Sequence, residues 1–170
     1  LTHYAFEELH ELVDALLAPR GVVGLVERRA VRARLLELLA DEAFMATPEL
    51  TPARRYLGER PESWDARDAI DRRRFQLADQ LAGLFESYAR ARPGLLEAWA
   101  RGEGWFEGTA GEATEGWQRA LWSTQRARFG DELVTPREAA AMLRAGEVRP
   151  PRMLHVFSLG EVGPADYELL

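Results

Sequence analysis

The 170-residue chain contains no cysteine and no lysine. Without cysteine, disulfide bonds, thiolate nucleophiles and zinc–thiolate sites are excluded, which fits the reducing cytoplasm. No segment matches the phosphate-binding pattern GxxxxGK[ST], which itself requires a lysine. No apolar run approaches the roughly 18 residues that a membrane span needs, and no signal peptide is apparent. We therefore expect a cytoplasmic protein without a P-loop nucleotide site.

All 22 basic residues are arginine, and 28 acidic residues bring the net charge to −6. Codon usage in a GC-rich genome accounts for this bias; selection for bidentate contacts with phosphate or carboxylate is the alternative. The negative balance argues against a free-standing duplex-DNA binder, which usually carries excess positive charge. It is compatible with an arginine-lined channel inside a larger assembly. An apolar fraction of 46% is enough for the core of one domain, with or without an appendage.

Hydrophobic periodicity predicts a mainly α-helical chain. Helices are expected over residues 5–18, 25–44, 51–58, 66–92, 93–102, 113–129 and 135–143. Thr51 is expected to be an N-cap with Pro52 at the first helical position, and Thr135 with Glu138 forms a capping box. Four glycines make residues 102–112 a predicted flexible loop.

After the last predicted helix, the spacing of apolar residues changes from that of a helix to that of a strand. Met153, Leu154, Val156 and Phe157 form an apolar run of strand length. One strand cannot stand alone, because its backbone donors and acceptors need partners. The chain also starts at Leu1 without methionine and stops at Leu170 in what reads as the start of a helix. We therefore expect a segment of a longer protein.

Catalytic and metal-binding patterns are weak. His10 and Asp14 could hold a metal from one helix face, but a solvated face is the more common explanation, and His155 falls on the expected strand. No serine has a histidine in a recognisable elbow. Adjacent acids such as Asp41 and Glu42 are typical of caps and surfaces. The sequence thus predicts no catalytic residue in this segment.

Aromatic and arginine residues leave two interpretations open. Trp117, Leu121 and Trp122 have helical spacing and are expected in the core, whereas tryptophan in a binding site can stack on nucleobases. Trp105, in the glycine-rich loop, is expected to be exposed. The run Arg72–Arg74 reads as a solvated helix face or as a phosphate contact. Arg92, before the helix break at Pro93, could bind the last carbonyls of the helix or a ligand.

Four segments, in order, resemble the RecC family, the gamma subunits of exodeoxyribonuclease V (RecBCD). They are VRARLLELLADEAF with the later RRYL, FQLADQLAGLFESYARARPGLLEAW, WQRALW, and PPRMLHVFSLGEVGPADYELL. The resemblance covers most of residues 25–170 and is specific in combination, whereas the first 24 residues match poorly. Two departures are visible: Gly83 stands where the family often has aspartate, and Ser158 and Gly163 occupy glycine and proline positions.

The resemblance implies a fold. It suggests the helical, 1B-like subdomain of an inactivated superfamily 1 helicase over residues 1–150. Residues 151–170 would then supply the strand and the helix start of a RecA-like α/β core. The missing P-loop is expected for such a protein.

The resemblance also implies a role in ATP-dependent DNA unwinding and degradation during double-strand-break repair by recombination. The segment would be non-catalytic, would guide DNA strands and would read the Chi sequence, with ATP and magnesium used by RecB-like and RecD-like partner subunits. The positions carried over as DNA contacts are Leu84, Glu86 and Arg92, with Arg137 a weaker candidate. Glutamate can accept from an exocyclic amine, and arginine can donate to guanine or phosphate.

Two alternatives remain at this point. The segment could be a helical protein-interaction scaffold that makes no direct DNA contact. It could also belong to the related AddB class, which is expected to carry a helicase-like start and cysteine iron–sulfur ligands that this segment does not contain.

Overall fold

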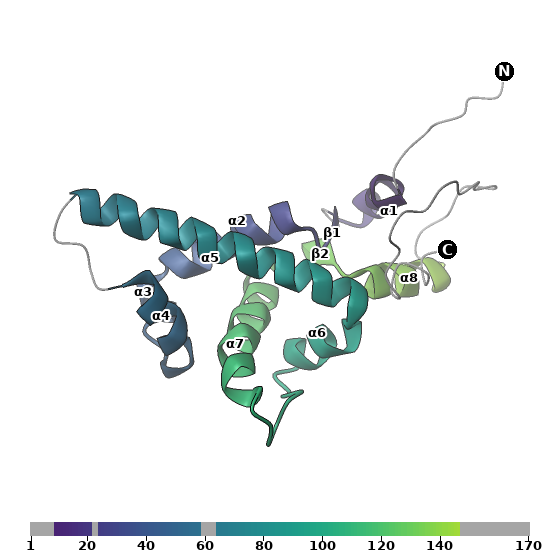
Figure 1. Ribbon diagram of the computed structural model, residues 1–170. Coiled ribbons are helices and arrows are strands. Elements are labelled where there is room, and N and C mark those ends of the chain that lie inside the picture. The colour runs from purple at the N-terminus through teal and green to yellow at the C-terminus, as the bar shows by residue number, and fades with distance from the viewer. Residues whose placement is uncertain (1–8, 22–23, 59–63, 147–170) are drawn as a thin grey trace.

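The computed structural model describes residues 9–21, 24–58 and 64–146 (Figure 1). Within these ranges the chain is mainly helical, as predicted. The α-helices are α1 (Leu9–Leu17), α2 (Arg28–Ala40), α3 (Glu42–Met45), α4 (Thr51–Leu57), α5 (Trp64–Ala91), α6 (Pro93–Ala100), α7 (Glu112–Phe129) and α8 (Pro136–Arg144). The strands are β1 (Gly24–Leu25) and β2 (Leu133–Val134). The expected strand at 153–157 and the expected second domain at 151–170 lie outside the described residues.

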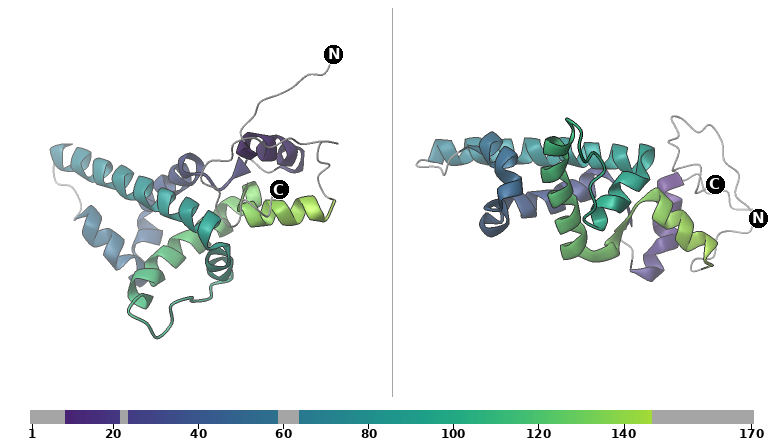
Figure 2. Two further views of the ribbon diagram at one scale, coloured as in Figure 1. Left: turned by 45° about the vertical axis from the view of Figure 1, so that its right-hand side comes forward. Right: turned by 90° about the horizontal axis from the view of Figure 1, so that it is seen from below.

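The long helix α5 lies across the top of α3, α4, α6 and α7 (Figure 1). Helix α2 packs along it, α3 and α4 lie below its N-terminal end, and α6 and α7 lie below its C-terminal half. Helices α1 and α8 lie beyond the C-terminal end of α5, next to the strands, in all views (Figure 2). None of the described helices is both long and apolar enough to cross a membrane.

The main core is built around three aromatic side chains. Phe85 of α5 meets Trp99 of α6 and Trp122 of α7 edge to face, with ring centroids 6.3 Å and 5.3 Å apart. The Trp122 indole Nε1 donates a hydrogen bond to the Leu96 carbonyl at 3.0 Å. Leu121 is also fully buried, and Trp117 is half-buried against the same cluster. The expectation that these tryptophans belong to the core is confirmed.

Helical spacing predicts that the apolar stripe of α5 consists of Ile70, Leu77, Leu81, Leu84 and Tyr88, and the structure differs from this prediction in one turn. Phe85 is fully buried, whereas Leu84 and Tyr88 are only half-buried. The stripe moves because two tryptophans from α6 and α7 converge on Phe85, and periodicity within α5 carries no information about those partners.

The helix predicted over residues 25–44 is wrong at both ends. Leu25 belongs to β1, and α2 starts at Arg28. The helix stops before Asp41, whose extended backbone (φ −76°, ψ 104°) lets its carboxylate accept from Phe44 N at 3.0 Å and cap α3. The Phe44 amide, and then the ion pair with Arg128, hold the pKa of Asp41 below its ordinary value.

The cap predicted at Thr51 is also wrong. The residue at the N-cap position of α4 is Leu50, and the Thr51 hydroxyl donates backwards to the Pro48 carbonyl at 2.6 Å. A 3-10 turn over Pro48–Leu50 runs directly into α4 and leaves no extended residue to act as a cap.

The two strands form a parallel pair that the sequence analysis missed. Gly24 lies opposite Leu133, and Leu25 lies opposite Val134. Two-residue strands are too short to show alternation. The capping box predicted at Thr135 is confirmed: its hydroxyl accepts from Glu138 N at 3.2 Å, while the Glu138 carboxylate accepts from Thr135 N at 2.7 Å.

Candidate nucleic-acid interface

Arg92 occupies the break between α5 and α6. Its amide closes the last turn of α5 on the Tyr88 carbonyl at 2.8 Å, and its own carbonyl accepts from Leu95 N at 3.0 Å. Pro93 then occupies the first turn of α6, where a missing amide proton costs nothing. The backbone of Arg92 is therefore fixed by both helices, while its side chain is exposed. In the described part of the chain, no hydrogen bond or ion pair holds its guanidinium.

Glu86 lies half-buried on α5, six residues before Arg92. Its carboxylate is 3.8 Å from the Arg90 guanidinium, a loose pair at i,i+4 spacing. It also faces the start of α2. The pKa of Arg28 is raised chiefly by the hydrogen bond to Asp79 and then by the charge of Asp79, and the charge of Glu86 adds to the increase. Glu86 thus lies beside cations and retains acceptor capacity.

Gly83, where the family often has aspartate, lies directly under Arg28. A Cβ at this position would be 3.6 Å from Arg28 Nε. The carboxylate on this face comes instead from Asp79, one turn earlier, which accepts from Arg28 and from Arg32 Nη1 at 2.9 Å. The hydrogen bonds from Arg28 and Arg32 hold the pKa of Asp79 below its ordinary value. Asp79 therefore supplies a carboxylate on the face of α5 that also carries Gly83.

Leu84 and Glu86 do not share a face of α5. Residues two positions apart on an α-helix are separated by about 200° around its axis. Both side chains are half-buried, so neither is withdrawn from the surface completely. A single strand that touches both must pass across α5 rather than along one side of it.

Arg137 begins α8 and reaches α6. Its Nε lies 3.7 Å from Glu97 Oε1, and its side chain is 46% exposed. Arg92 and Arg137 therefore flank α6, one at its start and the other beside its middle turn. The structure brings these two candidates near one helix, with Leu84 and Glu86 on the adjoining half of α5.

Glu115 was missed by the sequence analysis. This α7 carboxylate is only 3% exposed and accepts hydrogen bonds from Trp99 Nε1 at 2.6 Å, Phe106 N at 2.8 Å and Trp105 N. Burial raises the pKa of Glu115, but the three hydrogen bonds outweigh burial, so that the net pKa lies below the ordinary value. The loop expected to be flexible is thus tied to the core at Trp105 and Phe106.

The run Arg72–Arg74 fans around α5 into three different settings. Arg74 pairs with Asp71 and donates to the Leu39 carbonyl at 3.2 Å, which joins α5 to α2. The Arg73 guanidinium lies against Gly58, whose φ of +91° favours glycine. Arg72 donates to the Asp68 carbonyl at 3.3 Å. The exposed Arg72 fits the interpretation as a solvated helix face, whereas Arg73 and Arg74 are half-buried against neighbouring elements.

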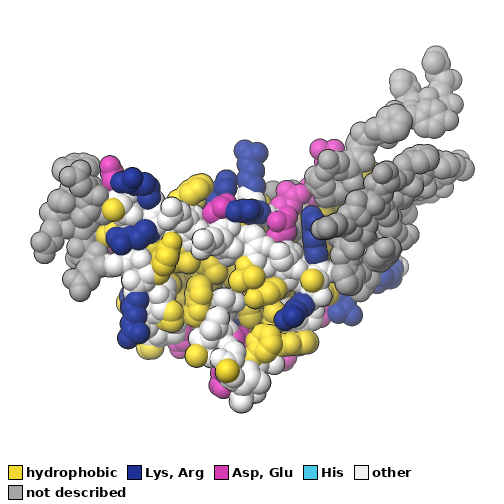
Figure 3. Space-filling view, in the orientation of Figure 1, with side chains coloured by type: hydrophobic (Ala, Val, Ile, Leu, Met, Phe, Trp, Pro, Cys, Tyr) yellow, Lys and Arg dark blue, Asp and Glu magenta, His cyan; other side chains and the backbone are white. Residues whose placement is uncertain are grey.

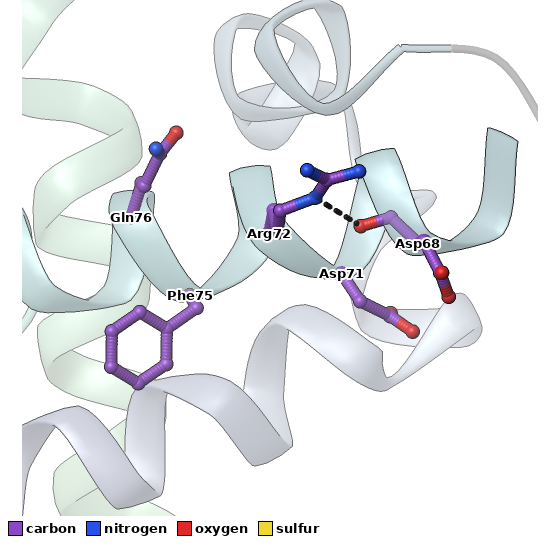
Figure 4. Close-up of a pocket in the computed structure, with 5 residues that line it drawn as sticks. All are labelled: Asp68, Asp71, Arg72, Phe75 and Gln76. Atoms are coloured by element: carbon purple, nitrogen blue, oxygen red, sulfur yellow. Dashed lines mark hydrogen bonds between the residues drawn. The ribbon is translucent and has the colours of Figure 1, made fainter. Parts of the chain in front are cut away.

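A surface hollow of about 490 Å³ lies on the N-terminal half of α5 (Figure 4). Asp71 and Phe75 lie on one side of the helix and Arg72 and Gln76 on the other, with Asp68 a turn away. Phe75 is 48% exposed, with the Arg32 guanidinium 5.0 Å from its ring centre. With two acids and one arginine, this lining suits a protein side chain better than a phosphate.

Figure 3 shows arginine and acidic side chains dispersed over the visible face, and apolar side chains gathered below α5. The described residues contain no cluster of three or more histidine or acidic side chains that could hold a metal ion. The proposed pair of His10 and Asp14 is not tested, because the His10 side chain lies outside the described part. The Asp14 carboxylate accepts from Leu25 N at 2.8 Å and so ties α1 to β1.

Comparison with known proteins gives a consistent result. The family model described as "RecC, N-terminal domain" matches residues 8–170. The RecBCD enzyme subunit RecC of Mycobacterium tuberculosis is 38% identical over 102 residues, and its counterpart in Mycolicibacterium smegmatis is 33% identical over 100 residues. Each match covers 58% of this chain but only 9% and 8% of the respective relative, so the chain spans a small part of their length. No solved structure gives a significant match.

Proposed function

The chain belongs to the RecC family, and from that membership we propose that it is the N-terminal segment of a non-catalytic subunit of an exodeoxyribonuclease V-type enzyme. In this proposal RecB-like and RecD-like partners, using ATP and magnesium, unwind and degrade DNA during double-strand-break repair. The segment guides a single strand and takes part in reading a Chi-like sequence. It is a 1B-like helical subdomain, followed by the start of a RecA-like core, and it acts in the cytoplasm.

The observation that carries the proposal is that the Arg92 side chain is exposed while its backbone is held by two helices. A guanidinium that is exposed, and that rises from a backbone fixed by two helices, is ready to donate to phosphate or to guanine. Because its backbone is already ordered, binding costs side-chain entropy but little backbone entropy. Glu86 is the acceptor for an exocyclic amine, Leu84 gives an apolar contact, and Arg137 adds a second cation beside α6.

The test is single-stranded DNA binding by the full-length protein assembled with its partners, measured across a salt series. Arg92→Ala is expected to weaken binding about tenfold. If Arg92 contacts phosphate, the slope of log K against log salt also becomes shallower by about 0.7. If it contacts a base, affinity falls while the slope stays constant.

The matched control is Arg55→Ala, which removes an exposed arginine from α4 below the other end of α5. It is expected to leave both affinity and slope unchanged. Equal behaviour of the Arg92→Ala enzyme and the wild type, in binding and in Chi response, would remove Arg92 from the site.

A second candidate function, a protein-interaction scaffold, is favoured by one observation. The hollow beside Phe75 combines an exposed aromatic ring with Asp68 and Asp71, a setting that suits an apolar or basic side chain of a protein partner. If this function dominates, Phe75→Ala impairs co-purification of the partner subunits. The Arg92→Ala change would then alter neither assembly nor DNA binding.

A further inference from the structure

We propose that Trp105 is a stacking platform for an unpaired nucleobase, placed beside Arg92. The inference rests on the proposed function, because it assumes that a single strand passes this part of the molecule. It adds a residue that the family resemblance did not assign. The ligand class is a single-stranded nucleic acid, contacted through the π face of one base.

The first ground is that Trp105 is exposed yet anchored. Its side chain is 53% exposed, more than that of Tyr56 or Phe75. Its amide, with that of Phe106, is bound by the buried carboxylate of Glu115. The loop thus holds a large apolar ring in solvent at a defined place, which has an energetic cost. A stacking partner would remove that cost.

The second ground is that Trp105 lies at the same end of α6 as Arg92. The six-membered ring of Trp105 lies over Gly94, and a Cβ built there would be 3.4 Å from Cη2 of the indole. A side chain longer than alanine at this position would displace the ring. Gly94 is two residues after Arg92, so the exposed indole and the exposed guanidinium lie at the same end of α6. An aromatic face beside a cation is the pairing that single-strand binding proteins use.

The third ground is the local charge. Arg101 is paired with Glu103 at 2.7 Å, and the Arg119 guanidinium lies close to Gly104 and to the charge of Glu115. With Glu107 and Glu112 included, acidic residues outnumber arginines in this loop, and Arg92 is the nearby cation without a partner among the described residues. Stacking needs no net charge because every base presents a π face. The arrangement therefore favours a base on Trp105 with its phosphate near Arg92.

The experiment uses the full-length protein assembled with its partner subunits and a single-stranded oligonucleotide that carries 5-iododeoxyuridine for photocrosslinking. Wild type, Trp105→Ala, Trp105→Phe and Tyr56→Ala are compared for affinity, and the crosslinked residue is mapped by mass spectrometry. Tyr56 is the matched control, since it is an exposed aromatic residue on α4 with no assigned role. Co-purification of the partners is measured for each variant.

The expected result is a loss of affinity of about tenfold for Trp105→Ala, recovery to within about threefold for Trp105→Phe, no change for Tyr56→Ala, and a crosslink on Trp105. If the wild type binds the oligonucleotide and the Trp105→Ala variant binds it with the same affinity, the stacking role is overturned and the proposed function still stands. Failure of the wild-type assembly to bind the oligonucleotide would overturn both. Loss of partner subunits from the Trp105→Ala preparation, without loss of DNA affinity, would assign Trp105 to a protein interface and overturn the proposal.

Discussion

The two ends of α5 use their polar side chains differently. At the N-terminal end, Arg74 bonds to the Leu39 carbonyl, Arg73 lies against Gly58, and Arg54 of α4 donates to the carbonyls of Met45 and Thr47. These arginines hold short helices together where the apolar core is thin.

At the C-terminal end, packing depends on aromatic rings instead. Phe85, Trp99 and Trp122 fill the space between α5, α6 and α7. Because the rings and the buried carboxylate of Glu115 fix this end, Arg92 is left exposed. The difference teaches that the number of arginines does not show how many guanidinium groups are left available, because most arginines at the N-terminal end of α5 are used in packing.

The largest expected effect comes from adjacent substitutions in α5. Phe85→Ala should lower the local stability of α5–α7 by about 3–5 kcal/mol, because it empties the centre of the aromatic cluster. Leu84→Ala, on the half-buried side, should cost less than about 1.5 kcal/mol. Hydrogen exchange on peptides of the full-length protein measures both. Similar losses for the two variants would contradict the observed placement of Phe85 and Leu84.

An intermediate effect is expected for Glu115→Gln. It should loosen residues 102–111 and cost about 1–3 kcal/mol, because one buried and two partly buried donors lose a charged acceptor. The pKa of Glu115 is lowered in the fold, so its stabilisation is present above the ordinary glutamate pKa of about 4.3 and is lost as pH falls through the folded value. The wild type should therefore be more stable than the Glu115→Gln variant at neutral pH, and this difference in stability should disappear only in acid. A constant difference in loop hydrogen exchange from about pH 7 down to about pH 3 would contradict this role.

The smallest effects are expected for two arginine substitutions, one near each end of α5. Arg54→Ala should destabilise α3 and α4 by about 1–2 kcal/mol, since two carbonyls lose their donor. Arg92→Ala should change local stability by less than about 0.5 kcal/mol, as expected for an exposed side chain without a partner in the described chain. Hydrogen exchange in each region provides the measurement. A loss at Arg92 as large as that at Arg54 would erase the contrast between the two ends.

Local chemistry made part of this structure predictable. The capping box at Thr135, the helix break at Pro93 and the burial of Leu121 and Trp122 each depend on residues within a few positions of one another, and each is confirmed. The exposure of Trp105 was also predicted correctly.

What the sequence could not supply depends on contacts between distant segments. The β1–β2 pairing joins Gly24 to Leu133, and Phe85 is buried by rings from two other helices. Glu115 has no local pattern that marks it, because its donors, Trp99, Trp105 and Phe106, are brought to it by the fold. The assignments of Leu84, Glu86, Arg92 and Arg137 as DNA contacts stay predictions.

The central claim, membership in a RecBCD-type machine, is tested most directly by purifying the full-length protein from its native cells and identifying what accompanies it by mass spectrometry. The account predicts stoichiometric partners that carry helicase and nuclease motifs, and ATP-dependent degradation of linear duplex DNA by the purified assembly. A protein that purifies alone, without such activity, would contradict the claim and leave only the family's fold in common.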